Sequence, residues 1–178
     1  TDEVWCLTIY KNKLFSGSRD KTIRVWDADT HAHVATLEGH TDEVWCLTIY
    51  KNKLFSGSAD GSIHVWDANT HTHVATLEGH TNSVCCLTIY KKMLFSGTFG
   101  STVRVWDADT HTHVATLQGH TDEVWCLTIY KNKLFSGSRD KTIRVWDADT
   151  HAHVATLEGH TDEVWCLTIY KNKLFSGS

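Results

Sequence analysis

The sequence lacks three features that would direct a chain to particular partners or compartments. It has no excess of positive charge, since 17 Lys and Arg residues stand against 21 Asp and Glu residues. A basic surface for nucleic acid or for an anionic membrane is therefore not expected. No apolar run approaches the roughly 20 residues that span a bilayer; the longest, residues 4–10, has the length of a strand. No N-terminal signal pattern is present either.

Cysteine is present, but its placement does not suggest disulfides. Five of the six cysteines share one position of a recurring block, and Cys85 is the sixth. Equivalent positions in neighbouring repeats usually lie beyond the roughly 7 Å between Cα atoms that a disulfide allows. We expect free thiols in a reducing, cytoplasmic compartment, with a strained Cys85–Cys86 bridge as the alternative.

The chain repeats itself with a period of 40 residues. Residues 1–40 recur unchanged at 121–160, and residues 161–178 repeat 1–18. The block 41–80 differs from the first at six positions, and the block 81–120 differs at twelve. A fixed period indicates one supersecondary unit per repeat. We expect a single array over 1–178, with units 1–40, 41–80, 81–120 and 121–160 and a remnant at 161–178.

Each repeat is predicted to form four short strands and no helix, because β-branched and aromatic residues alternate with polar turns. Lys11-Asn12 is predicted to make a tight turn, since Asn tolerates positive φ. Apolar residues occupy both faces of the sheet, so the sheet must be covered on both sides. Stacking of the repeats as blades of a β-propeller achieves this. The first repeat has its expected strands at Val4–Tyr10, Lys13–Ser18, Thr22–Trp26 and His33–Leu37.

Recurring dipeptides connect this pattern to a known family. Val-Trp-Asp ends the third expected strand of all four units, and Gly-His closes each unit. With a Ser-rich strand and an Asp turn in about 40 residues, the chain resembles the WD40 repeats over its whole length. The run 4–27 is similar to propellers of F-box/WD ubiquitin-ligase adaptors, of TNF-receptor-associated-factor-type ubiquitin ligases and of Dictyostelium myosin-heavy-chain kinases. The expected fold is all-β, a partial WD40 propeller of four four-stranded blades and half a fifth.

The resemblance implies a buried hydrogen-bond network across each blade. In the family, a His, a Ser or Thr, an Asp and a Trp form it; Ser58 and its equivalents are an alternative hydroxyl. The same set recurs in every repeat, so we expect a structural role and no catalytic residues. Gly100 replaces the Asp in the third repeat, which we expect to weaken that blade. The matching residues are Ser16, Asp20 and Trp26; His40, Ser56, Asp60 and Trp66; His80, Ser96 and Trp106; and His120, Ser136, Asp140 and Trp146.

The resemblance also implies a partner-binding rim, built from three positions per blade: the two residues that flank Val4 and the residue before the turn Asp. Trp and Arg at such positions favour a peptide or protein ligand of aromatic, acidic or proline-rich character. Packing of the indoles over the neighbouring blade is the alternative. Arg occurs only at 19 and 139, so phosphopeptide recognition, known in F-box/WD adaptors, is not favoured. The rim residues are Glu3, Trp5, Arg19, Glu43, Trp45, Ala59, Ser83, Cys85, Phe99, Glu123, Trp125, Arg139, Glu163 and Trp165.

Histidine pairs two residues apart, such as His31 and His33, recur in each full repeat. On a strand this spacing places both side chains on one side, as a metal site requires. Nothing nearby supplies further ligands, so neither a metal nor another cofactor is expected. His31 occupies a position where the family often has Gly, and it is predicted to adopt positive φ.

Three functions are compatible with this sequence. The first is a non-catalytic scaffold for protein partners. The second is the substrate-recruiting propeller of a ubiquitin ligase or an α-kinase-type kinase, with the catalytic part outside this chain. The third is a purely structural array.

The number of repeats bears on how the blades are completed. WD40 rings usually close with about seven blades, so four and a half would leave an open arc with uncovered apolar faces. Because the chain starts at Thr1 within the pattern, we expect a piece of a longer propeller. The alternative is a homodimer that completes a ring and displaces its spare half-blades.

Overall fold

The computed structural model describes residues 2–178 and consists of short strands joined by tight turns. Contacts divide it into two compact units, one ending at Val84 and one covering Cys85–Ser178. Each unit is described in turn. No helix within the described residues is long and apolar enough to cross a membrane.

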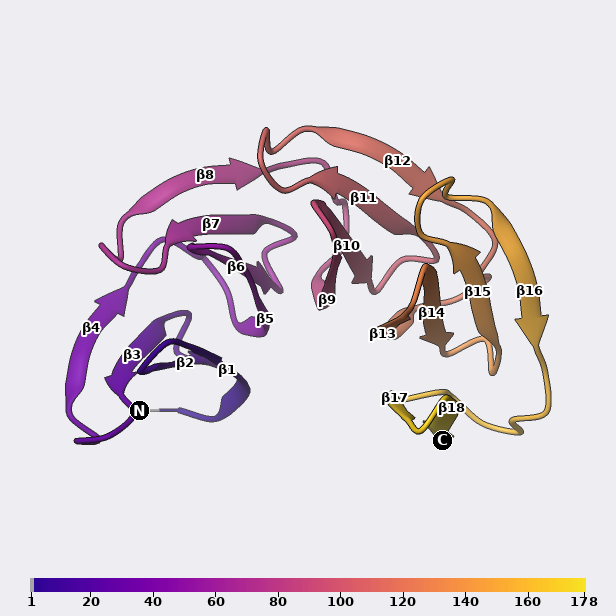
Figure 1. The fold of residues 1–178 in the computed structure, drawn as a ribbon, viewed down its shortest axis with the longest axis horizontal. Helices are drawn as coiled ribbons and strands as arrows, with labels where there is room; N and C mark the ends of the chain where they lie inside the picture. Colours follow the sequence, from indigo (N-terminus) through magenta and orange to yellow (C-terminus); the bar gives the residue numbers. More distant parts are fainter. Residues whose placement is uncertain (1) are drawn as a thin grey trace. The chain divides into compact units, whose positions relative to one another are not determined.

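The first unit contains two antiparallel four-stranded sheets, each in sequence order from one edge to the other (Figure 1). They correspond to the first two repeats, so each repeat forms one blade. The first blade comprises β1 (Val4–Tyr10), β2 (Lys13–Ser18), β3 (Ile23–Asp27) and β4 (His33–Leu37); the second comprises β5 (Val44–Tyr50), β6 (Lys53–Ser58), β7 (Ile63–Asp67) and β8 (His73–Leu77).

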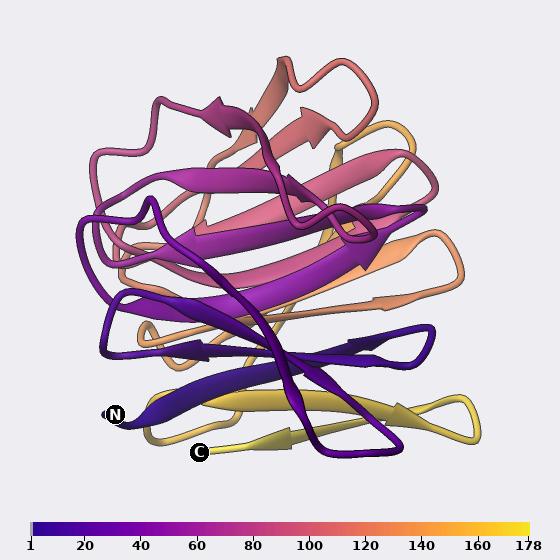
Figure 2. The same ribbon diagram turned by 90° about the vertical axis from the view of Figure 1, so that its left-hand side faces the viewer.

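The second unit contains two further four-stranded sheets and one two-stranded sheet. The hairpins and their short turns can be followed in Figure 2. The third blade comprises β9 (Val84–Tyr90), β10 (Met93–Thr98), β11 (Val103–Asp107) and β12 (His113–Leu117). The fourth comprises β13 (Val124–Tyr130), β14 (Lys133–Ser138), β15 (Ile143–Asp147) and β16 (His153–Leu157), and the half-blade comprises β17 (Cys166–Tyr170) and β18 (Lys173–Gly177).

The apolar core of each unit lies between consecutive blades. In the first unit, Phe15 and Val25 of the first blade pack with Leu54 and Trp66 of the second. In the second unit, the equivalent residues of the third and fourth blades form the same cluster. Where two blades of one unit face each other, their apolar faces are covered as expected, because burying apolar surface drives this stacking. The expectation that every sheet is covered on both faces is not met in the first blade, where Leu7 and Ile9 are exposed.

A β-bulge interrupts the first hairpin of three full blades. The register shifts between Val4 and Cys6, between Val44 and Cys46, and between Val124 and Cys126. A bulge leaves one residue without a cross-strand partner and re-aims its side chain. The displaced residue is the tryptophan at the fifth position of the repeat, so this local irregularity determines where the rim indoles point.

Two local expectations need correction. The third strand is Ile23–Asp27, not Thr22–Trp26, and the Thr22 amide donates to the Asp20 carboxylate in the turn before it. In the first turn Lys11, not Asn12, adopts positive φ, at 53°. His31 has positive φ, at 61°, as predicted, and lies in the turn before β4, so His31 and His33 do not share a strand.

Candidate functional site: the strand-end rim

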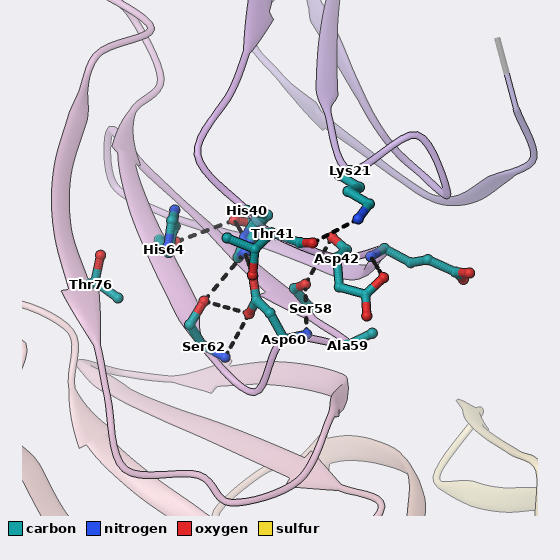
Figure 3. A network of polar contacts seen from close by, with 12 residues as sticks. Lys21, His40, Thr41, Asp42, Ser58, Ala59, Asp60, Ser62, His64 and Thr76 are labelled. Carbon is teal, nitrogen blue, oxygen red and sulfur yellow. Dashed lines mark hydrogen bonds and ion pairs between the residues drawn. The ribbon is translucent and has the colours of Figure 1, made fainter.

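A hydrogen-bond network ties the second blade together behind the candidate rim (Figure 3). The Nδ1 atom of His40 lies 2.9 Å from the Asp60 carboxylate, and its Nε2 atom lies 2.8 Å from Ser56 Oγ. The Trp66 indole N–H donates to the same Ser56 oxygen at 2.9 Å. Burial lowers the pKa of His40, which keeps the imidazole neutral. A neutral ring with its proton on Nδ1 donates a hydrogen bond to Asp60 and accepts one from the Ser56 hydroxyl at Nε2. Both ring nitrogens therefore have a hydrogen-bond partner.

The fourth blade repeats this arrangement, with His120 bonded to Asp140 and to Ser136 at 2.7 Å each. The first and third blades retain the Trp–Ser bond, from Trp26 to Ser16 and from Trp106 to Ser96. Ser56 and Ser136 are fully buried. Their hydroxyl groups accept from Trp66 and Trp146, respectively, and lie within the core of each blade.

The second serine of this strand has a different task. Ser58 Oγ accepts from the Asp60 amide at 3.1 Å and donates to the Asp42 carbonyl at 3.1 Å. It therefore shapes the turn that presents the rim, while Ser56 serves the Trp–His network. The choice between the two hydroxyl groups that the sequence left open is resolved in favour of Ser56.

Backbone pairing brings the rim positions of one blade together. The Arg19 amide donates to the Glu3 carbonyl, and the Ala59 amide donates to the Glu43 carbonyl, at 2.9 Å each. Arg139 and Glu123 are joined in the same way at 2.9 Å. Residues 16 apart in the sequence thus adjoin at one end of the first hairpin.

Each rim arginine contacts a glutamate from each of two consecutive sheets, and Arg139 also lies 3.9 Å from Asp122. The Arg19 guanidinium lies 3.2 Å from Glu3 and 3.3 Å from Glu43. Arg139 lies 3.4 Å from Glu123 and 2.8 Å from Glu163. The Glu3 hydrogen bond raises the pKa of Arg19, and the charge of Glu163 raises the pKa of Arg139. Both guanidinium groups are about half exposed, yet their charge is compensated.

The rim of the first unit has one exposed and one partly exposed tryptophan. Trp5 is 53% exposed, and Trp45 is partly exposed. The Trp45 indole donates to Glu43 at 3.0 Å. Ala59 lacks a functional side chain, and Ser83 Oγ donates to the Ala59 carbonyl at 3.0 Å. Trp45 and Arg19 therefore converge on one carboxylate, that of Glu43.

The rim of the second unit is an aromatic cluster. Phe99 meets Trp125 edge-on with ring centroids 4.6 Å apart, and Trp125 lies 4.7 Å from Trp165. Trp165 is 53% exposed, whereas Trp125 is partly exposed and its buried Nε1 atom has no hydrogen-bond partner. Cys85 is not part of this aromatic contact; its thiol donates to the Val124 carbonyl. The Trp125 side chain is thus both packed and partly exposed, since it contacts Phe99 and Trp165 without being covered by them.

A histidine stack behind the rim was not predicted from the sequence. His64, which replaces the Arg24 of the first repeat, stacks on His40 at 4.0 Å with an interplanar angle of 21°. It also meets His73 edge-on at 5.0 Å, and its buried Nδ1 atom has no hydrogen-bond partner. The Arg-to-His change between repeats was the available signal.

His64 is expected to make the stability of the chain depend on pH. Burial, then the neighbouring His40 and His73, lowers its pKa to about 4, below an unfolded value of about 6.5. The unfolded chain binds the proton more readily, so stability falls as pH drops from about 6.5 towards 4. Because the ring is partly solvated, we expect a loss of about 1–2 kcal/mol.

Urea unfolding at pH 7.5 and pH 5.0 measures this loss. The variant His64→Arg restores the residue of the other three repeats and should show a smaller difference between the two pH values. The burial-lowered pKa values of His40 and His120 contribute to the remaining difference. An equal loss in both proteins would show that His64 is not responsible.

The other candidates from the sequence are distributed as follows. All six cysteines are free, so Cys85 and Cys86 are not bridged. Within residues 2–178 no cluster of three or more His, Cys, Asp or Glu side chains could hold a metal ion. His71 turns its ring edge towards Phe15 at 6.3 Å, and His73 bonds Thr76. The paired histidines thus have separate packing roles.

Comparison with known proteins shows which family the 40-residue repeat resembles. The family model described as "WD domain, G-beta repeat" matches residues 1–27, 32–67, 71–107, 111–147 and 152–178. No curated protein matches the sequence. Among solved structures, the computationally designed Ika8 protein is similar, with 34% identity and a TM-score of 0.89 over 98% of this chain. The present chain spans 55% of the length of that protein. With WD40 matches in every repeat, the chain belongs to the WD40 family.

Proposed function

We propose that the rim binds a peptide or protein segment and that the chain serves as a non-catalytic interaction module. Membership of the WD40 family supports a protein-interaction scaffold in general. The observation that carries the rim assignment is the aromatic cluster Phe99–Trp125–Trp165, which keeps indole surface in contact with solvent. Tryptophan is the residue type that most often dominates binding energy at interfaces.

The charge arrangement favours one kind of segment. Arg19 and Arg139 each already contact two glutamates. A phosphate or carboxylate ligand would have to displace these glutamates and leave their charges uncompensated. An aromatic or proline-rich segment needs no such exchange, because it can stack on the indoles. We therefore favour aromatic or proline-rich partners over acidic or phosphorylated ones.

Random-peptide phage display on the immobilised chain tests this proposal. We expect enriched peptides to contain Trp, Tyr, Phe or Pro, and to bind about tenfold more weakly to Trp45→Ala and Trp125→Ala, as for a hot-spot residue. Val74→Ala and Val114→Ala are matched controls, because these exposed side chains lie on the fourth strands of their blades. Binding should be unchanged in both.

Two outcomes would contradict the proposal. Peptides that bind the rim variants as tightly as the unaltered chain would place the binding surface elsewhere. Loss of thermal stability in Trp45→Ala and Trp125→Ala, without any peptide enriched on the unaltered chain, would instead support a packing role for these indoles.

A further inference from the structure

An apolar face of the first blade is uncovered in the described chain. Leu7 is 62% exposed and Ile9 is 66% exposed, although both lie on a strand of the sheet. Next to them is an apolar hollow of about 330 Å³, lined by Ile9, Leu14 and Trp26 together with Asp27, Ala28 and His31. An uncovered apolar surface of this kind is typical of an interface.

The second blade shows what such a face is built to contact. Its equivalent residues Leu47, Ile49 and Leu54 belong to the apolar cluster that contains Phe15 of the preceding blade. In the third and fourth blades, Leu127 and Leu134 belong in the same way to the cluster that contains Phe95. The hollow beside Leu14 is thus expected to receive the apolar face of another blade, which includes its second-strand phenylalanine.

In the fourth blade, the apolar face that carries the equivalent phenylalanine, Phe135, is only partly covered. Its outer residue Leu157 is 39% exposed, whereas the equivalent Leu37 is 4% exposed beneath a complete blade. The half-blade 161–178 provides two strands where a complete blade provides four. A hollow lined by Ile143, Leu157 and Leu174 remains beside it.

We propose that the first blade of a second copy of this chain docks on the fourth blade and displaces the half-blade 161–178. Residues 121–160 are identical to 1–40, and residues 161–178 are identical to 1–18. The incoming β1 and β2 therefore make the contacts that the half-blade makes. Its β3 and β4 then add a second pair of strands, including Trp26, over Ile143 and Leu157.

Contacts of the turn lysines support the same alignment of the incoming blade on the fourth blade. Lys11 donates to Asn69 of the following blade at 2.8 Å, and Lys91 lies 2.7 Å from Asp149. Lys131 is the equivalent lysine of the fourth blade, and Asp29 occupies the repeat position of Asn69 and Asp149. In the proposed contact, Asp29 of the second copy lies opposite Lys131, and its Glu3 replaces Glu163 beside Arg139.

The contact joins two different surfaces, one from each copy, so it is heterologous. The two copies together contain eight four-stranded sheets, four from each.

The mass of the 178-residue chain tests whether two copies associate. It is measured by light scattering after size exclusion, across a dilution series. We expect a concentration-dependent multiple of the 20.1 kDa monomer.

Two variants at equivalent positions of identical sequence make the test specific. Leu7→Glu places a charge in the docking face and should weaken association at least tenfold; because Leu7 is exposed, the fold should persist, as circular dichroism would verify. Leu167→Glu weakens the competing half-blade and should strengthen association several-fold. Ile9→Glu provides a second variant of the docking face.

A monomeric mass at every concentration would overturn the proposal. So would association that Leu7→Glu and Ile9→Glu leave intact, or association that Leu167→Glu weakens as strongly as Leu7→Glu does. Opposite effects at these two leucines are expected only if the first blade and the half-blade compete for the same surface.

Discussion

Replacement of Asp60 by alanine is expected to lower the free energy of unfolding by about 3 kcal/mol, among the largest effects of any single polar substitution in this chain. The Asp60 carboxylate accepts from His40, from the Thr41 amide at 2.9 Å and from Ser62. Hydrogen bonds to Ser62, Thr41 and His40 lower the pKa of Asp60 despite its burial. Without this acceptor, the Nδ1 atom of the buried His40 ring retains only its longer contact with Ser62 Oγ, at 3.3 Å.

Asp20→Ala is the matched control, because Asp20 occupies the same position of the first blade. Its carboxylate accepts from Thr22 and contacts Arg24, and residues 2–19 contain no histidine that could take the place of His40. Losing these partly buried turn contacts should cost about 1 kcal/mol. Urea unfolding of both variants at pH 7.5 measures the difference, and equal losses would contradict a dominant role for the His40–Asp60 pair.

Gly57→Ala is expected to lower the free energy of unfolding by about 2–3 kcal/mol through overpacking. A Cβ atom at Gly57 would lie 2.6 Å from Cys46 Sγ and 2.6 Å from Val84 Cγ1. The thiol also donates to the Val84 carbonyl at 3.6 Å, so neither neighbour can move away freely. The small gain in backbone rigidity from alanine does not offset such a clash.

Gly177→Ala in the half-blade provides the internal control for this clash. A Cβ atom there would meet Cys166 Sγ at 2.8 Å and no other atom within 4 Å. We expect its cost to stay below about 1 kcal/mol, since a single exposed side chain can shift. Thermal unfolding of both variants is the measurement. A Gly57→Ala protein as stable as Gly177→Ala would mean that the Cys–Gly–Val contact tolerates an extra methyl group.

Local sequence was sufficient to predict the elements. The strand bounds Val4–Tyr10, Lys13–Ser18 and His33–Leu37 match the structure, because strands and turns depend on residues a few positions apart. Positive φ at His31 was predicted from the resemblance, because the family often has Gly at that position. Lys11 was missed because the residue that adopts positive φ in a two-residue turn depends on the twist of both strands.

The features that surround the candidate rim depend on more distant contacts. The β-bulge at Trp5, the clamp on Arg19 and the stack of His64 on His40 each join residues from different strands or blades. The sequence named Trp5 and Arg19 as rim residues, but it did not indicate that two glutamates neutralise each arginine. That outcome follows from the spacing of consecutive blades.

Comparison of the identical stretches 1–18 and 161–178 distinguishes what local sequence determines from what packing between blades determines. Both form a hairpin of the same register, with Cys6 paired to Gly17 in one and Cys166 paired to Gly177 in the other, because hairpin register depends on local pattern. The first strand nevertheless begins at Val4 in one and at Cys166 in the other. Yet Phe15 is fully buried while Phe175 is 48% exposed, and Val4 is 56% exposed while Val164 is fully buried. Sequence by itself thus determined the repeat and the register of the hairpin. Burial depended on which blade lies against each face, since removal of apolar surface from water requires a neighbour that the local sequence does not encode.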